Sequence, residues 1–216
     1  MGNLIQGHKN GDFHMTKKTN DTVTTNPNTS MPAEPAALGL FGLAVAAFVI
    51  GSGYLELTSG TDKILMVPWI LFFGATAQTI AGIVEFKRNN VFGATVFSTY
   101  AMAMFAIAFT LLLTIFGGVS FDISHYAFGL IAILAVSLIA TVASLMTNKV
   151  FFCILVVVDI ALAGLIPHYL ISASSLIGGI FLLATSALAF YGALSILINT
   201  MAGKTIMPLG STIWKP

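Results

Sequence analysis

From residue 34 onward, long apolar stretches alternate with short segments that carry the charged residues. A helix that crosses a bilayer needs about 20 apolar residues. Four stretches have the length of one crossing, and the last one, 150–203, is too long for one and has a predicted break at Pro167-His168. The expected helices are 35–55, 64–84, about 91–116, 126–148, 150–167 and 173–200. The pattern therefore predicts an all-α, polytopic membrane protein with six transmembrane helices per subunit.

Composition supports the same class. Apolar residues make up 57% of the chain, charged residues 8%, and the mean hydropathy is +0.95, whereas soluble proteins carry about 25% charged residues. The net charge of +1 gives no sign of nucleic-acid binding. We therefore expect a multi-pass protein of the cell membrane, either an inner membrane or a plasma membrane, with the lipid bilayer as its surroundings.

The polar residues divide the chain into three regions. Residues 1–33 are rich in Asn, Thr, Lys and Gly and lack an apolar run, so we expect a disordered tail and no secretory signal peptide. Residues 34–203 form the predicted helical bundle, and 204–216 form a C-terminal tail.

The distribution of cations predicts the orientation of the helices. If both termini are cytoplasmic, eight of the nine Lys and Arg residues lie on the inner side and only Lys63 lies outside. Cytoplasmic loops are enriched in Lys and Arg. The sequence therefore predicts that both termini are cytoplasmic.

Small and polar residues recur on one side of the second predicted helix. Gly74, Gln78 and Gly82 are four residues apart, and Glu85 follows seven residues after Gln78, so all four share a face. Such a face suits close helix packing or the wall of a hydrated path. Because an amide facing lipid is costly, Gln78 is expected to line a path. Glu85, next to two cations, is either an interfacial ion pair or a residue of a vestibule.

Three sequence patches carry a resemblance to a known family. Residues 77–100 match the pattern A-Q-x-x-A-G-x-x-E-[YF]-x-x-x-N-x-[FW]-G followed by a Thr-Tyr pair. Residues 34–40 resemble the signature N-P-A-P-L-G-L, and 205–210 resemble T-x-x-P-x-G. The chain resembles the acetate uptake transporter family, whose bacterial members are called succinate–acetate permeases, over about residues 34–212. The resemblance implies a homohexamer with one path per subunit, with acetate as the first substrate and succinate or other small carboxylates after it.

The start of the first helix is one expected binding site. Pro35 suits a first helical turn, and the free amides of the residues that follow give this end a partial positive charge that attracts anions. An ordinary helix start is the alternative interpretation, but the family signature lies here. Two residues depart from it, Glu34 for Asn and Ala37 for Pro. The expected site comprises Pro35, Ala37, Leu38, Gly39 and Leu40.

A second expected site is an apolar constriction halfway along the path. The resemblance implies a waist built from Tyr100, a phenylalanine position that is Leu43 here, and a leucine position that is Val158. An apolar waist can exclude hydrated ions by dewetting while a partly apolar solute passes. Without the resemblance, Tyr100 is a buried tyrosine whose hydroxyl needs a partner.

Asp159 is the third candidate. It lies ten residues beyond Lys149 in an otherwise apolar helix, about 15 Å deep in the bilayer. A carboxylate at that depth costs at least ~2.5–3.5 kcal/mol and must face the protein interior. Either Asp159 takes up a proton during transport, or it ties helices together through hydrogen bonds.

Enzymatic chemistry has no support in the sequence. We find no nucleophile paired with a base, no phosphate-binding loop and no metal-ligand cluster, so we expect no enzyme activity, no cofactor and no metal. Two function classes stay open: a transporter of small carboxylates, acting as a channel or as a proton-coupled permease, and a non-transporting membrane sensor or scaffold with the same fold.

Overall fold

The computed structural model describes residues 31–58, 63–117 and 122–215. Within these ranges the secondary structure is entirely helical, and six helical spans are long and apolar enough to cross a membrane. The six predicted spans are confirmed. The tail predicted at 1–33 lies almost wholly outside the described residues. The elements are α1 (Ala36–Tyr54), η1 (Lys63–Leu65), α2 (Met66–Trp69), η2 (Ile70–Ala77), α3 (Gln78–Lys87), α4 (Val91–Phe116), η3 (Ile123–His125), α5 (Tyr126–Ser144), α6 (Lys149–Ile171) and α7 (Leu176–Ala202).

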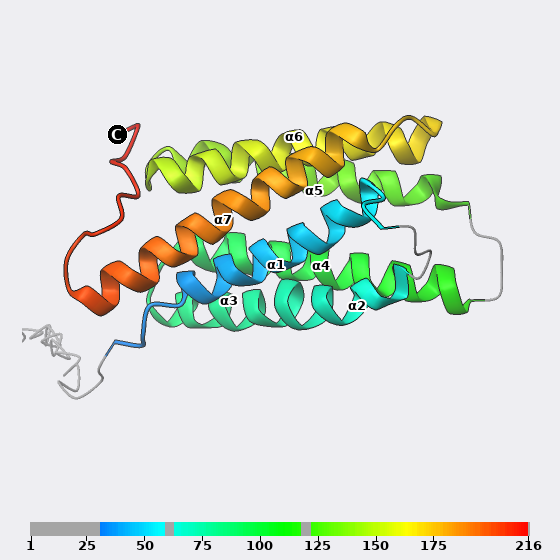
Figure 1. The fold of residues 1–216 in the computed structure, drawn as a ribbon. Helices are drawn as coiled ribbons and strands as arrows, with labels where there is room; N and C mark the ends of the chain where they lie inside the picture. Colours follow the sequence, from blue (N-terminus) through cyan, green and yellow to red (C-terminus); the bar gives the residue numbers. More distant parts are fainter. Residues whose placement is uncertain (1–30, 59–62, 118–121, 216) are drawn as a thin grey trace, which may run out of the picture. The chain divides into compact units, whose positions relative to one another are not determined.

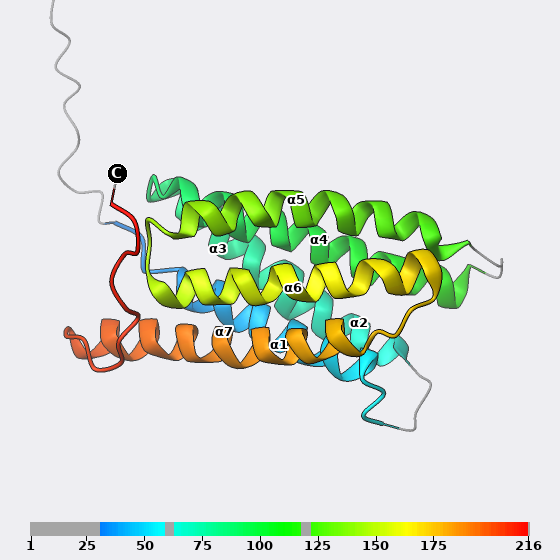
Figure 2. The ribbon, with the colours of Figure 1, turned by 90° about the horizontal axis from the view of Figure 1, so that it is seen from above.

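The six spans form a closed ring around a common axis. The elements η1, α2, η2 and α3 together form the second span, Lys63–Lys87. Around the ring, α1 packs on the second span, the second span on α4, α5 on α6, α6 on α7, and α7 on α1, while α4 and α5 touch over a short stretch. Figures 1 and 2 show the spans running side by side.

We name the two ends of this bundle by the chain segments found there. The tail end holds the start of α1 and the C-terminal segment, and the far end holds the end of α1 and the start of α7 (Figure 1).

Helix α6 corrects the predicted break at Pro167-His168. The helix continues through Pro167 to Ile171 and ends at Ser172, whose φ of 54° is left-handed. Proline removes one backbone hydrogen bond from a helix, but transmembrane helices tolerate it where neighbouring groups satisfy the freed carbonyl. Helix α6 closes only after Ile171, where the carbonyl of Pro167 accepts the amides of Ser172 and Ala173, so it ends four residues later than expected.

The second span is less regular than the single helix predicted at 64–84. Its central eight residues, Ile70–Ala77, form a π-helix that leads into Gln78. Thr76 donates its hydroxyl hydrogen to the carbonyl of Leu71 at 2.8 Å. π-Helical segments inside α-helices often occur at functional sites, and nothing in the hydrophobic pattern indicates this one.

The small-residue face of the second span packs against α1 and α4. A Cβ atom on Gly74 would lie 2.8 Å from the Cβ of Ala46 and 3.0 Å from Met104, and one on Gly82 would collide with Ser98. Of the two expected uses of this face, the structure confirms close helix packing.

The C-terminal segment after α7 folds back onto the tail end. Asn199 accepts the amides of Ile206 and Met207 at 2.7 and 2.9 Å and donates to the carbonyl of Met207 at 2.7 Å. The amides of Ile213 and Trp214 both donate to the carbonyl of Leu145. The patch 205–210, which resembles the family signature, is therefore held against the bundle by a side chain of α7.

Candidate functional site

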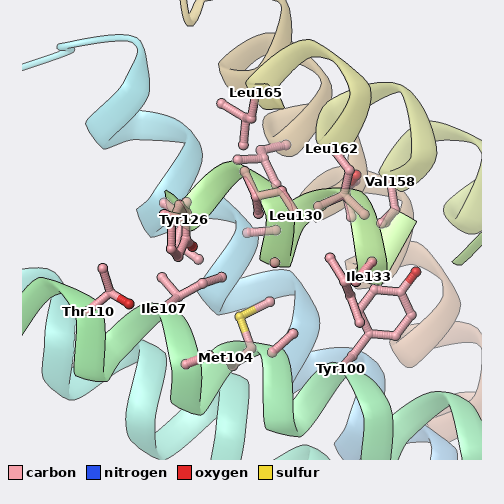
Figure 3. Close-up of a pocket in the computed structure, with 18 of the residues that line it drawn as sticks. Tyr100, Met104, Ile107, Thr110, Tyr126, Leu130, Ile133, Val158, Leu162 and Leu165 are labelled. Carbon is pink, nitrogen blue, oxygen red and sulfur yellow. The ribbon is translucent and has the colours of Figure 1, made fainter. Parts of the chain in front are cut away.

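The three residues that we expect to form the waist all line the same cavity. Leu43 of α1, Tyr100 of α4 and Val158 of α6 are 5–8% exposed and line a cavity of about 440 Å³, the waist cavity. Figure 3 shows Tyr100 and Val158 near one end of it, and Thr110 and Tyr126 near the other. Its size falls in the range of small-molecule sites, and most of its lining is aliphatic.

Two further cavities lie along the same axis. The mouth cavity, about 430 Å³, opens at the far end and is lined by Lys63 and His168. The tail cavity, about 360 Å³, is lined by Ala36 at the start of α1 and by polar residues near the other end of the bundle. Along α6, the tail cavity touches Phe151, the waist cavity touches residues 158–165, and the mouth cavity touches residues 168 and 169. The three cavities therefore follow one another from end to end.

A thin apolar layer separates the tail cavity from the waist cavity. Leu40, Phe97 and Ile154, which we name the closing layer, are 2–3% exposed. Residues 151 and 158 of α6, on either side of the layer, are about 10 Å apart along the helix. The ring of Phe97 lies over Gly39, where a Cβ atom would be 2.5 Å from a ring carbon. Glycine at that position therefore lets the ring lie this close to α1.

Asp159 is linked to the waist through hydroxyl groups of α5. Thr141 donates to one carboxylate oxygen of Asp159 at 2.6 Å, and Ser137 donates to the other. The hydroxyls of Ser137 and Tyr100 lie 2.6 Å apart. Because the hydrogen of Ser137 points to Asp159, Tyr100 is the donor to Ser137. A continuous hydrogen-bonded chain therefore connects the waist tyrosine to a carboxylate that is 8% exposed.

Gln78 is buried but lines none of the three cavities. Its side chain is 1% exposed, and among the described residues neither atom of its amide group has a hydrogen-bond partner. It lies against Gly42 of α1. The expectation that Gln78 lines a path therefore stays a prediction, and its position is at the contact between the second span and α1.

Glu85 lies at the tail cavity and is 1% exposed. It accepts a hydrogen bond from Asn90 at 3.0 Å, and the guanidinium of Arg88 lies 3.9 Å away. The sequence left open whether Glu85 belongs to an interfacial ion pair or to a vestibule. In the structure it has the cation of Arg88 nearby and also borders the tail cavity.

The start of α1 differs from the expected row of free amides. Pro35 is the N-cap, one position before the first turn, and its carbonyl already accepts the amide of Gly39 at 3.1 Å. The carboxylate of Glu34 accepts the amide of Ala36 at 3.3 Å and pairs with Arg88 at 2.6 Å. Because only the first residues of a helix have free amides, those of Gly39 and Leu40 are not available. Leu38 is exposed on the bundle surface, and Ala37 is half-buried.

Several residues of this region were not found from the sequence. Ser137, Thr141 and Ser144 lie three and four residues apart in an apolar helix, and all three are buried. That spacing places the three hydroxyl groups on one helix face. This feature of the sequence could have indicated which residues bind the carboxylate of Asp159. Tyr54, Tyr126 and Tyr169, which line the mouth cavity, gave no comparable signal, because they come from three different helices.

Comparison with known proteins agrees with these observations. Residues 16–209 match the model of the GPR1/FUN34/yaaH family. The chain is 27% identical over 194 residues to the succinate-acetate/proton symporter SatP of Escherichia coli, covering 83% of this chain and 96% of that protein. It is 26% identical over 205 residues to acetate permease A of Emericella nidulans, covering 85% and 68% of the two chains.

A solved structure shares the fold. The structure of the bacterial acetate channel SatP superposes with a TM-score of 0.77 at 23% identity and covers 83% of this chain and 99% of its own. The family match spans most of the sequence and confirms the resemblance of the three patches, and the protein is a membrane protein of six spans. The chain belongs to the GPR1/FUN34/yaaH family.

Proposed function

We propose that the protein carries acetate and related small carboxylates, succinate among them, across the membrane through a path inside each subunit. Family membership supports this, as do the names of relatives that it matches over most of its length. The observation that carries the proposal is the series of three cavities along one bundle axis, interrupted by the closing layer. A membrane sensor or scaffold does not need a series of internal cavities, so the series favours transport over that alternative. We also propose that the protein is a transporter and not an enzyme.

The apolar waist suits a solute with one charged and one apolar face. Acetate can present its methyl group to Leu43 and Val158, and its carboxylate can accept a hydrogen bond from Tyr100 when Ser137, rather than Tyr100, is the donor between the two hydroxyls. A hydrated inorganic ion loses its water in the same cavity with few polar groups to replace it. The cavity therefore favours small organic carboxylates over ions such as chloride.

Uptake of labelled acetate into vesicles with the purified protein tests the proposal. At about pH 7.5 acetic acid is almost entirely ionised, so passage of the neutral acid through lipid is small. We expect saturable entry, inhibited by succinate, that is absent from protein-free vesicles. Entry no faster than in protein-free vesicles contradicts the proposal.

We further propose that the chain from Tyr100 through Ser137 to Asp159 couples acetate movement to a proton. The polar groups that face Asp159 are the hydroxyls of Ser137 and Thr141. A proton on Asp159 would be donated in a hydrogen bond to Ser137, and Ser137 would then donate to Tyr100. The hydroxyl hydrogen of Tyr100 would thereby be free to point into the waist cavity. The alternative is a channel in which Asp159 only ties α5 to α6.

The variant Asp159→Asn distinguishes the two mechanisms. Proton coupling predicts that wild-type uptake follows an imposed pH gradient and that the variant loses this dependence. Ser137→Ala is expected to act in the same direction. Ser144→Ala is the matched control, because Ser144 lies on the same face of α5 but donates to the carbonyl of Thr141. A variant Asp159→Asn that keeps the full pH dependence contradicts the coupling.

Orientation and assembly complete the proposal. We propose that the tail end is cytoplasmic, since Lys87, Arg88 and Lys149 lie there, and that six subunits form a ring. The many large apolar side chains on the bundle surface suit contact with lipid and with neighbouring subunits. A fluorescent protein fused to the C-terminus reports the orientation, because it fluoresces in the cytoplasm, and native mass spectrometry in detergent reports the number of subunits.

A further inference from the structure

Three tyrosines from three helices meet at the far end of the bundle. Tyr54 is the last residue of α1, Tyr126 is the first residue of α5, and Tyr169 lies near the end of α6. The hydroxyls of Tyr54 and Tyr169 are 2.5 Å apart. The rings of Tyr126 and Tyr169 pack edge to face with centroids 4.8 Å apart. The ring of His168 packs edge to face against both Tyr54 and Tyr169.

This cluster lies where the mouth cavity meets the waist cavity. Tyr54 and Tyr126 line both cavities, and so do Ile50, Ile107 and Thr110. Tyr169 lines the mouth cavity, which extends to the exposed Lys63. A solute that moves between the bundle surface and the waist therefore passes the hydroxyl pair.

The chemistry of the pair suits a carboxylate. Each phenol hydroxyl has one hydrogen to donate, and the hydrogen bond between the two hydroxyls uses only one of them. A carboxylate can accept both hydrogens, and hydrogen bonds to an ionised acceptor are about twice as strong as those between neutral groups. Breaking the Tyr54–Tyr169 bond is thus compensated when a carboxylate enters between the hydroxyls, whereas an apolar solute or a cation offers no acceptor.

We propose that Tyr54 and Tyr169 form a gate that opens by binding the substrate carboxylate, a binding subsite distinct from the waist. Lys63 at the mouth raises the local concentration of anions, and the hydroxyl pair replaces part of the water that the carboxylate loses on entering the aliphatic waist cavity. This inference rests on the proposed function, because it assigns that function a second carboxylate subsite.

Binding and transport of acetate by the double variant Tyr54→Phe/Tyr169→Phe test the gate. The variant keeps both rings and removes both hydroxyls. Acetate binding is measured by isothermal titration with the purified protein, and uptake is measured in vesicles. We expect the dissociation constant and the half-saturating concentration for acetate each to rise about tenfold. Tyr191→Phe is the matched control, because it also removes a phenol hydroxyl, one that donates to Pro208 near the tail end, and both constants should stay unchanged.

Each outcome bears on the gate separately from the proposed function. Unchanged binding and uptake in the double variant, with thermal melting as in the wild type, would overturn the gate while leaving transport intact. Wild-type protein that binds acetate without transporting it would refute the proposed function, and a loss of that binding in the double variant would still support the subsite. Wild-type protein that binds no acetate would overturn both.

Discussion

Replacing Phe97 by alanine opens the closing layer between the tail cavity and the waist cavity. Phe97 is 3% exposed and lies over Gly39, beside the equally buried Leu40 and Ile154. With the ring gone, the two cavities become continuous unless neighbouring side chains move in. Replacing a buried phenylalanine by alanine costs about 3–5 kcal/mol of stability, so the variant should unfold at a lower temperature than the wild type.

The same substitution that lowers the stability of the protein is expected to raise the rate of acetate transport. If the closing layer contributes at least about 1.4 kcal/mol to the barrier, acetate flux should rise about tenfold or more. Chloride flux should rise by a larger factor than acetate flux, because dewetting at an apolar constriction excludes hydrated ions more strongly. The expected result is therefore faster but less selective transport.

Flux of labelled acetate and of chloride into the same vesicles measures both effects. Phe109→Ala is the matched control, since Phe109 is on the same helix but 62% exposed on the bundle surface, and both fluxes should match the wild type. A folded Phe97→Ala variant with unchanged acetate and chloride fluxes would show that the closing layer is not the barrier and would refute this reasoning.

Three further predictions concern packing, the tail cavity and the C-terminal segment. Gly42→Ala should lower the melting temperature, because the new Cβ atom collides with the backbone carbonyl of Phe73; Gly129→Ala, where no atom lies within 4 Å, should be neutral or stabilising by up to about 1 kcal/mol. Glu34→Gln should lower the half-saturating acetate concentration, because it removes a negative charge that borders the tail cavity and frees Arg88; an unchanged value at low ionic strength argues against this. Asn199→Ala removes three hydrogen bonds to Ile206 and Met207 and should speed amide hydrogen exchange there, with Tyr191→Phe showing a smaller effect through Pro208; equal exchange in the Asn199 variant and wild type would contradict the anchoring role.

The sequence by itself determined the class of fold, because the bilayer imposes a simple rule. Any segment that crosses it must satisfy its own backbone hydrogen bonds and be about 20 apolar residues long. Apolar runs, the last of them long enough for two crossings, therefore located six helices, and the family resemblance predicted a waist of Leu43, Tyr100 and Val158, which line one cavity. The break expected at Pro167 was wrong, because the loss of one backbone hydrogen bond does not by itself end a transmembrane helix, and α6 continues to Ile171.

Only the tertiary structure decided which polar residues act together. Asp159 was visible as a buried carboxylate, but its partners Ser137 and Thr141 are on α5, and the link to Tyr100 requires α4 and α5 to meet at one depth. The pairing of Tyr54 with Tyr169 joins residues 115 positions apart. Hydrophobic periodicity shows which side of a helix is apolar, but it does not show which helix that side packs against. The contacts between helices are therefore known only from the tertiary structure.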